Sequence, residues 1–434
     1  MAEATSSRFT TRSLFRDRAT VFRFGSVLGL QMGQVFPAAF IGLFLPVIFR
    51  EQGLALDMYW VFTLPAIPTW IRPLWAPFVD RTGSRVIGMR KTWFVPCTAF
   101  GALAYLSLTL FAPTLDNLAV IITLLVIKTT FMTTQDIAID GYMIENIEDA
   151  ERPVGAAVLD IGRNIARFTA WAGIAWIYSV WGWNAAVTTA SVLLIAFSLP
   201  GIIRPEPPRP APLLREPPSL KRIFRRRDSR YVYPMCFLIA LVGSLIPALY
   251  PTYLSDLGFS IGRIAAVAAP ATLLGTLIGA STTSWFLGRF GYKKTILTAA
   301  FCIVLAVLPI MWMGSLEEPT FVIVFAVTLN AIALPSFLDV SFQAARLKWA
   351  SKVQAGTDYT TQIVTMTAGA GLATAIGGLL AEHLGWYFYF VVAGILISGA
   401  CFVLYRVFDR IEELVDDRDI AEAAEAASQP ALES

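Results

Sequence analysis

Residues Lys128–Glu145 read KTTFMTTQDIAIDGYMIE, and the interpretation of the whole chain depends on this stretch. It closes an apolar run, Leu118–Phe131, yet it carries charged side chains at positions 128, 136 and 140. Inside a membrane each such charge costs about 2.5–3.5 kcal/mol, so it usually faces a protein interior or a watery cavity. Asp136 and Asp140 are four residues apart and therefore share one helix face. Two interpretations remain open: a polar seam along which a solute moves, or ion pairs that only lock helices together.

The composition places the chain among integral membrane proteins. Of its 434 residues, 56% are hydrophobic and 15% are charged, whereas a soluble protein carries about 25% charged residues. The four cysteines are far apart in apolar runs, and the single histidine, His383, lies in a predicted loop. This distribution favours structural thiols, so we expect no metal site, no cofactor and no enzyme active site.

Hydropathy predicts an all-α membrane protein with twelve transmembrane helices, because about 20 apolar residues cross a bilayer as a helix. The basic N-terminus leads into a long span without a convincing cleavage site, so we expect an uncleaved first helix. The predicted spans cover residues 24–49, 58–79, 92–112, 118–142, 156–180, 184–203, 232–254, 263–287, 295–314, 320–345, 359–382 and 386–405.

Lysine and arginine gather in the N-terminal tail and in the connections after spans two, six, eight and ten. The positive-inside rule then places both termini in the cytoplasm, with the protein in the cytoplasmic (inner) membrane. We divide the chain into an N-terminal tail, a six-helix bundle, a cytoplasmic linker, a second six-helix bundle and an acidic tail. These parts cover residues 1–23, 24–203, 204–231, 232–405 and 406–434.

The linker is rich in proline and then basic, with KRIFRRRDSR at residues 221–230. Its basic part either lies on anionic lipid or is simply solvated. The acidic, alanine-rich end of the chain, residues 412–434, is expected to be a frayed helix or disordered.

The two halves repeat each other. Phe78–Gly83 (FVDRTG) follows span two and Phe286–Gly291 (FLGRFG) follows span eight, at a separation of 208 residues. Gln135 and Gln343 are separated by the same 208 residues. Many transporters are built from such internal repeats, with their site near the middle of the membrane. The fold class is therefore two pseudo-symmetric six-helix bundles.

The turn Asp80–Gly83 (DRTG) and its degenerate copy at 288–294 resemble the loop signature of the major facilitator superfamily. Three further motifs are similar to signatures of its peptide/acetyl-CoA transporter branch, which contains AmpG-type muropeptide permeases and RhtX/FptX-type siderophore permeases. They are LWAPFVDR at 74–81, GMRKTW at 88–93 and QDIAIDGY at 135–142. Residues 355–362 (AGTDYTTQ) look closer to the siderophore permeases. Arg72-Pro73 and Gly141 depart from the AmpG-type pattern, which weakens the transfer of a particular substrate.

Folding spans four and five as a hairpin predicts a cluster of Asp136, Asp140, Arg163 and Arg167 near the cytoplasmic end of the first bundle. Either these groups form salt bridges that close an inner gate, or one aspartate exchanges a proton as the gate opens. Asp80 and Arg81 of the signature turn are further gate candidates.

Asp339 is the second isolated acid in an apolar run, and Arg346 follows seven residues later on roughly the same face. Asp339 is either a proton or substrate residue, or a structural partner of Arg346 or Lys348. Other polar groups in apolar helices are candidates for contacting solute, although each one alone is more often a packing residue. They are Gln31, Gln34, Lys128, Tyr250, Tyr253, Gln343, Tyr359 and Gln362.

The chain contains no GxxxxGK[ST] phosphate loop, so we expect an ion gradient rather than ATP to drive it. Protons are favoured because buried acids can titrate. The resemblance implies secondary active import of a bulky peptide-like or siderophore solute by alternating access. As the solute, a siderophore is favoured slightly over a muropeptide. An AmpG-like muropeptide permease, an exporter and a non-transporting membrane receptor are the alternatives. The expected partners are a small-molecule solute, protons and membrane lipid; we expect no nucleic acid, and a monomer.

Overall fold

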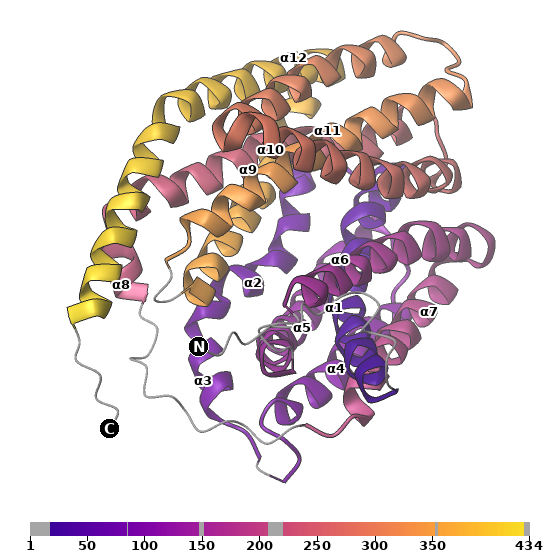
Figure 1. The fold of residues 1–434 in the computed structure, drawn as a ribbon. Helices are drawn as coiled ribbons and strands as arrows, with labels where there is room; N and C mark the ends of the chain where they lie inside the picture. The colour runs from indigo at the N-terminus through magenta and orange to yellow at the C-terminus, as the bar shows by residue number, and fades with distance from the viewer. Residues whose placement is uncertain (1–17, 85, 147–151, 207–219, 352–354, 429–434) are drawn as a thin grey trace. The chain divides into compact units, whose positions relative to one another are not determined.

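The computed structural model of the chain is almost entirely helical (Figure 1). It describes residues 18–84, 86–146, 152–206, 220–351 and 355–428. Within these ranges, eight helical segments are long and apolar enough to cross a membrane. The expected all-α membrane fold is confirmed.

Three of the eight segments contain a glycine outside helical geometry. Gly182, Gly291 and Gly385 have φ values of 78°, 75° and 76°, a backbone conformation that glycine adopts without steric cost. Each glycine divides its segment into two spans. With the interrupted segment 56–81, the helical segments match the twelve predicted spans in order.

The second span is broken, whereas the sequence was expected to form one continuous helix over 58–79. A 3₁₀ helix, Leu56–Ala66, is followed by α2 (Ile67–Ile71), a 3₁₀ turn (Arg72–Leu74) and α3 (Ala76–Arg81). The reason is the prolines at positions 65, 68, 73 and 77, because each lacks a backbone N–H and clashes with the preceding turn. The break places Arg72 in the short 3₁₀ turn.

The chain forms two compact units. The first contains residues 1–54, 64–212 and 259–269; the second contains 55–63, 213–258 and 270–434. The remaining helices of the first unit are α1 (Arg18–Glu51), α4 (Lys91–Leu106), α5 (Leu118–Asn146), α6 (Arg152–Phe168), a π-helix (Thr169–Ile174) and α7 (Ala175–Ile203). The second unit contains α8 (Leu220–Arg225), α9 (Ser229–Asp256), α11 (Phe321–Trp349), α12 (Ala355–Ser428) and most of α10 (Ile261–Gly314).

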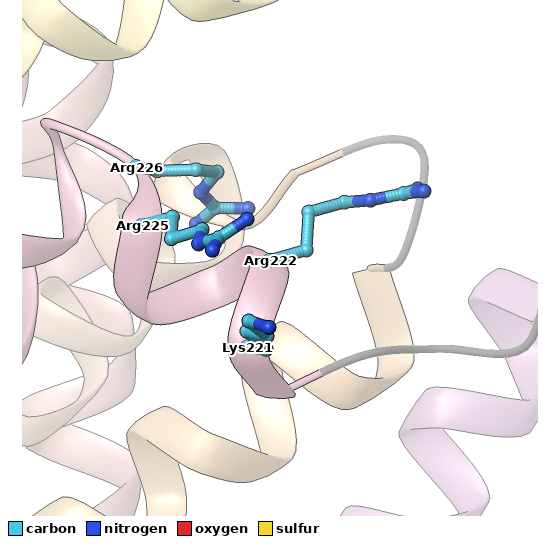
Figure 2. A pocket seen from close by; sticks show the side chains of 4 residues that line it. All are labelled: Lys221, Arg222, Arg225 and Arg226. Atoms are coloured by element: carbon cyan, nitrogen blue, oxygen red, sulfur yellow. The ribbon is translucent and has the colours of Figure 1, made fainter.

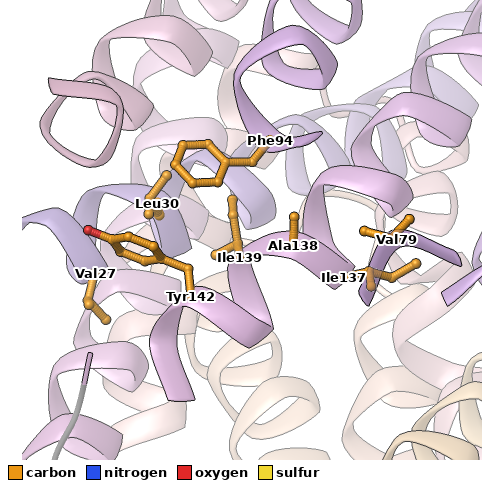
Figure 3. Close-up of a cluster of buried hydrophobic side chains, with 8 residues drawn as sticks. All are labelled: Val27, Leu30, Val79, Phe94, Ile137, Ala138, Ile139 and Tyr142. Atoms are coloured by element: carbon orange, nitrogen blue, oxygen red, sulfur yellow. The ribbon is translucent and has the colours of Figure 1, made fainter. Parts of the chain in front are cut away.

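In the first unit, α1 packs against α6 and α7, and α4 packs against α5. Close packing at α1 depends on small residues, since a Cβ at Gly29 would lie 2.4 Å from the carbonyl oxygen of Phe197. A core cluster on α1, α3, α4 and α5 includes Phe94 and Tyr142, whose rings are 5.7 Å apart (Figure 3). The same cluster contains Ile137, Ala138 and Ile139, so the residues of α5 that follow Asp136 are held in the hydrophobic core.

In the second unit, α12 continues as a helix to Ser428. Of the two alternatives expected for the end of the chain, disorder is therefore wrong for residues 412–428, which are helical. Lys348 forms an ion pair with Glu412, and Arg418 Nη1 lies 2.7 Å from Asp228 Oδ2. These contacts attach the end of α12 to α11 and to the start of α9.

Candidate functional site

Asp136 lies on α5 and faces the broken second span. Its Oδ2 atom is 3.9 Å from Nη1 of Arg72. The Asp136 side chain is 30% exposed and that of Arg72 is 10% exposed. An aspartate in a membrane helix is therefore close to a cation and only partly buried. Such an aspartate is a candidate for proton exchange.

Two amides and a lysine complete the surroundings of Asp136. Gln34 of α1 is a hydrogen-bond partner of the Asp136 carboxylate, and Gln31 Nε2 donates to Gln34 Oε1 over 3.0 Å. Lys128 is 5% exposed and lies within electrostatic range of Asp136. Its Nζ is 5.8 Å from the centre of the Tyr105 ring, where a cation is attracted by the ring electrons. We call Gln31, Gln34, Arg72, Lys128 and Asp136 the acidic-site cluster.

The charged groups near Asp136 include Asp140, Arg72 and Lys128. Helix α6, which carries Arg163 and Arg167, packs against α1. The predicted cluster of Asp136 and Asp140 with Arg163 and Arg167 stays a prediction. Asp140 itself is exposed.

The signature turn after span two is held by the start of the linker. The Glu206 carboxylate accepts hydrogen bonds from the backbone N–H groups of Arg90 and Lys91, over 3.0 and 3.1 Å. A Cβ at Gly83 would lie 2.6 Å from the carbonyl oxygen of Met89, so a close backbone approach requires glycine there. The side chains of the gate candidates Asp80 and Arg81 lie outside the described part of the structure.

A second polar group lies in the second unit, around Arg346 of α11. Gln343 Nε2 donates to the Tyr359 hydroxyl over 3.1 Å. The Arg346 guanidinium lies 5.5 Å from the Tyr359 ring centre and 5.7 Å from that of Phe342. It is 5% exposed, and its Nε and Nη1 atoms have no hydrogen-bond partner among the described residues. An anionic group would satisfy both nitrogens.

The remaining solute-contact candidates, on α9 and α12, are buried. Tyr250 bonds to Thr328 over 2.9 Å, and Tyr253 donates to the carbonyl of Ile310 over 3.2 Å; both tyrosines are buried. Gln362 is fully buried, and its amide lacks a partner among the described residues.

Asp339 is exposed, and in the described ranges it forms no ion pair with Arg346 or Lys348. The proposed structural role of Asp339 as a partner of these residues is therefore not seen.

Sequence reasoning missed a buried ionic network centred on Asp358, at the start of α12. Asp358 is 0% exposed. Its carboxylate accepts hydrogen bonds from Arg226 Nη2 over 2.7 Å, from the Ser351 backbone N–H over 2.8 Å and from the Tyr233 hydroxyl.

Asp228 joins this network, because it binds both Arg226, over 3.2 Å, and Arg418, over 2.7 Å. A signal for it was present in the sequence, since Asp228 is the one acid inside the basic run at 221–230. An isolated acid of this kind indicates a specific ion pair, but its partners are distant in sequence.

Comparison with known protein sequences supports this helical membrane architecture. The family pattern described as the Major Facilitator Superfamily matches residues 27–337. A protein of Rickettsia conorii, assigned by name as transporter AmpG 4, is 21% identical over 401 residues, covering 87% of this chain and 94% of that protein. The anhydromuropeptide permease of Escherichia coli (strain K12) is 24% identical over 214 residues, covering 48% of this chain and 43% of the permease.

Two solved structures share the fold. The nucleoside transporter NupG superimposes with a TM-score of 0.67 at 12% identity, covering 89% of this chain and 99% of that one. A bacterial homologue of the human lysosomal transporter Spinster, inward-facing and unoccupied, gives a TM-score of 0.65 at 15% identity, covering 90% of this chain and 98% of that one. At these identities the likeness concerns the fold.

Proposed function

The chain belongs to the major facilitator superfamily, and from this premise we propose that it is a proton-coupled importer of a peptide-like solute of the muropeptide class. It is a membrane transporter by family and fold. The proton coupling, the solute and the direction are our proposal, and the observation that carries it is the partly exposed carboxylate of Asp136.

Asp136 is suited to exchange a proton because its partners hold it weakly. The Arg72 nitrogen is 3.9 Å away, at the outer limit of an ion pair, and the Asp136 side chain is only partly buried. A small shift of the broken second span would separate the two groups or bring them together. Since a nearby cation favours the charged form of a carboxylate, such a shift would change the protonation of Asp136. Protonation and conformational change are thereby linked.

Each unit, taken by itself, carries polar groups that suit the amides or carboxylates of a solute. The Gln31–Gln34 pair can exchange hydrogen bonds with peptide groups. The Arg346 guanidinium has two nitrogens without a partner among the described residues, and a carboxylate is the group that such a fork binds best. Muropeptides carry both groups.

The choice of muropeptide over siderophore rests on the relatives. One is named as an anhydromuropeptide permease and another carries the AmpG name. Their low identity leaves a ferric siderophore as the second candidate, favoured by residues 355–362. An exporter remains the alternative in direction, and a receptor that accumulates no solute is the alternative in class.

The test is uptake into right-side-out and inside-out vesicles under an imposed proton gradient. Labelled anhydromuropeptide and labelled ferric siderophore are compared in each. We expect gradient-driven accumulation of the muropeptide in right-side-out vesicles. Accumulation only in inside-out vesicles would indicate an exporter, and accumulation of the siderophore alone would refute the muropeptide assignment.

The Asp136→Asn variant tests the coupling. It should abolish the response to the proton gradient while solute still equilibrates down its own gradient. Glu317→Gln is the control, since it neutralises an exposed acid outside the helices and should keep the response. If Asp136→Asn keeps a wild-type response, Asp136 is not on the proton path.

A further inference from the structure

The short helix α8 is held at the membrane surface by its connection to a span. It ends at Arg225, and α9, one of the apolar membrane segments, begins at Ser229. The intervening chain reaches at most about 14 Å when fully extended. Helix α8 therefore lies at the level of the lipid headgroups.

Basic side chains surround a hollow on α8. Lys221, Arg222, Arg225 and Arg226 line an open hollow of about 400 Å³ (Figure 2). Among the described residues, neither Lys221 nor Arg225 has an acidic partner within ion-pair distance. Several cations around one hollow repel each other, so a bound anion would relieve their repulsion.

One side of the hollow is fixed to the second unit. Arg226 turns inward, where Nη2 lies 2.7 Å from Oδ2 of the fully buried Asp358. Asp358 also accepts hydrogen bonds from Ser351 and Tyr233. Arg226 thus anchors the end of α8, and the other basic side chains project from a helix with a defined position.

Two apolar side chains of α8 differ in exposure. Ile223 is fully buried, whereas Phe224 is 61% exposed and has its ring 5.8 Å from that of Tyr233. An exposed aromatic beside basic residues is typical of helices that lie in the headgroup region of a membrane. A soluble anion would use the cations but would gain nothing from Phe224.

We propose that the basic hollow of α8 binds the headgroup phosphate of an anionic phospholipid, with Phe224 set among the adjacent lipid chains. Attraction to an anionic leaflet grows with each Lys or Arg near the surface. The site is independent of the solute and of the proton coupling proposed above.

The test counts lipid bound to the purified full-length protein. The delipidated protein is titrated with phosphatidylglycerol or with phosphatidylcholine, and bound lipid is measured by native mass spectrometry. The double variant Lys221→Gln/Arg225→Gln is compared with Arg227→Gln/Arg230→Gln. The second pair is also exposed and removes the same charge from the same segment, but it does not line the hollow.

We expect a stable one-to-one complex with phosphatidylglycerol, which the hollow variant binds about tenfold more weakly and the control variant binds like the wild type. Equal weakening in both variants would overturn the proposal, since it would mean diffuse attraction. Binding of inorganic phosphate as tight as that of the lipid would also overturn it, in favour of a soluble anion. Arg226 and Asp358 stay intact in both variants; if the double variant does not fold, Arg225→Gln is compared with Arg227→Gln in its place.

Discussion

Asp136 and Asp358 are both acids at the membrane helices of this protein, yet their surroundings differ. Asp136 has one cation at 3.9 Å and a side chain that is 30% exposed. Asp358 is fully buried and has Arg226 at 2.7 Å, the Ser351 N–H at 2.8 Å and the Tyr233 hydroxyl. Asp136 can change partners at little cost, whereas Asp358 cannot lose one without leaving a buried group unsatisfied.

The difference separates a carboxylate that can work in a cycle from one that holds the structure. A group that takes part in proton exchange needs access to water and only weak ion pairing; Asp136 is partly exposed and its ion pair with Arg72 is long. A structural carboxylate needs a complete set of short contacts, which Asp358 has. The comparison predicts that substitutions at Asp358 act on stability, while those near Asp136 act on transport.

The largest effect is expected for Asp358→Ala. Removing one partner of a buried ion pair typically costs about 3–5 kcal/mol, because the other charge stays buried without compensation. We expect a large fall in the thermal unfolding temperature in detergent, and a smaller fall for Asp358→Asn. Asp339→Ala is the control, since Asp339 is exposed on α11. An unchanged unfolding temperature for Asp358→Ala would show that the Asp358 network does not stabilise the protein.

A smaller effect is expected for Arg72→Gln, measured as initial rates of solute uptake. The ion pair with Asp136 is long and partly exposed, so its loss is worth about 1 kcal/mol, or roughly a fivefold fall in rate. The unfolding temperature should change little. Arg263→Gln removes the same charge from an exposed position at the start of α10 and should transport like the wild type. An equal fall for Arg263→Gln would show that the loss of any one positive charge, rather than of the Arg72–Asp136 pair, slows uptake.

The smallest effect is expected for Tyr250→Phe. It removes one neutral hydrogen bond to Thr328, worth about 1 kcal/mol of stability, and leaves the ring in place. The KM for solute should not change, because Tyr250 is a buried packing residue. A raised KM with unchanged stability would return Tyr250 to the set of solute-contacting residues.

The sequence was sufficient for the order of the spans, and it singled out Asp136 as a candidate without identifying its partner. Hydropathy locates each helix because every apolar span must satisfy its own backbone within the bilayer. The interruption of span two could also have been read from its four prolines. The pairing of Asp136 with Arg72 could not, because the two residues are far apart in the sequence and only packing brings them together.

The same limit explains the network at Asp358. Its members, Arg226, Asp228, Ser351 and Arg418, come from separate parts of the chain. The sequence of residues 412–428 does not indicate that this acidic helix is attached to α11 through Lys348 and to the start of α9 through Arg418.

The sequence by itself determined that this is a twelve-span membrane transporter with acids placed inside its helices, because the cost of exposing polar backbone and charge to lipid acts on each segment separately. Only the tertiary structure decided which of those acids is weakly held and which is locked. That distinction depends on distances between side chains from different helices, and such distances are set by packing rather than by the order of residues.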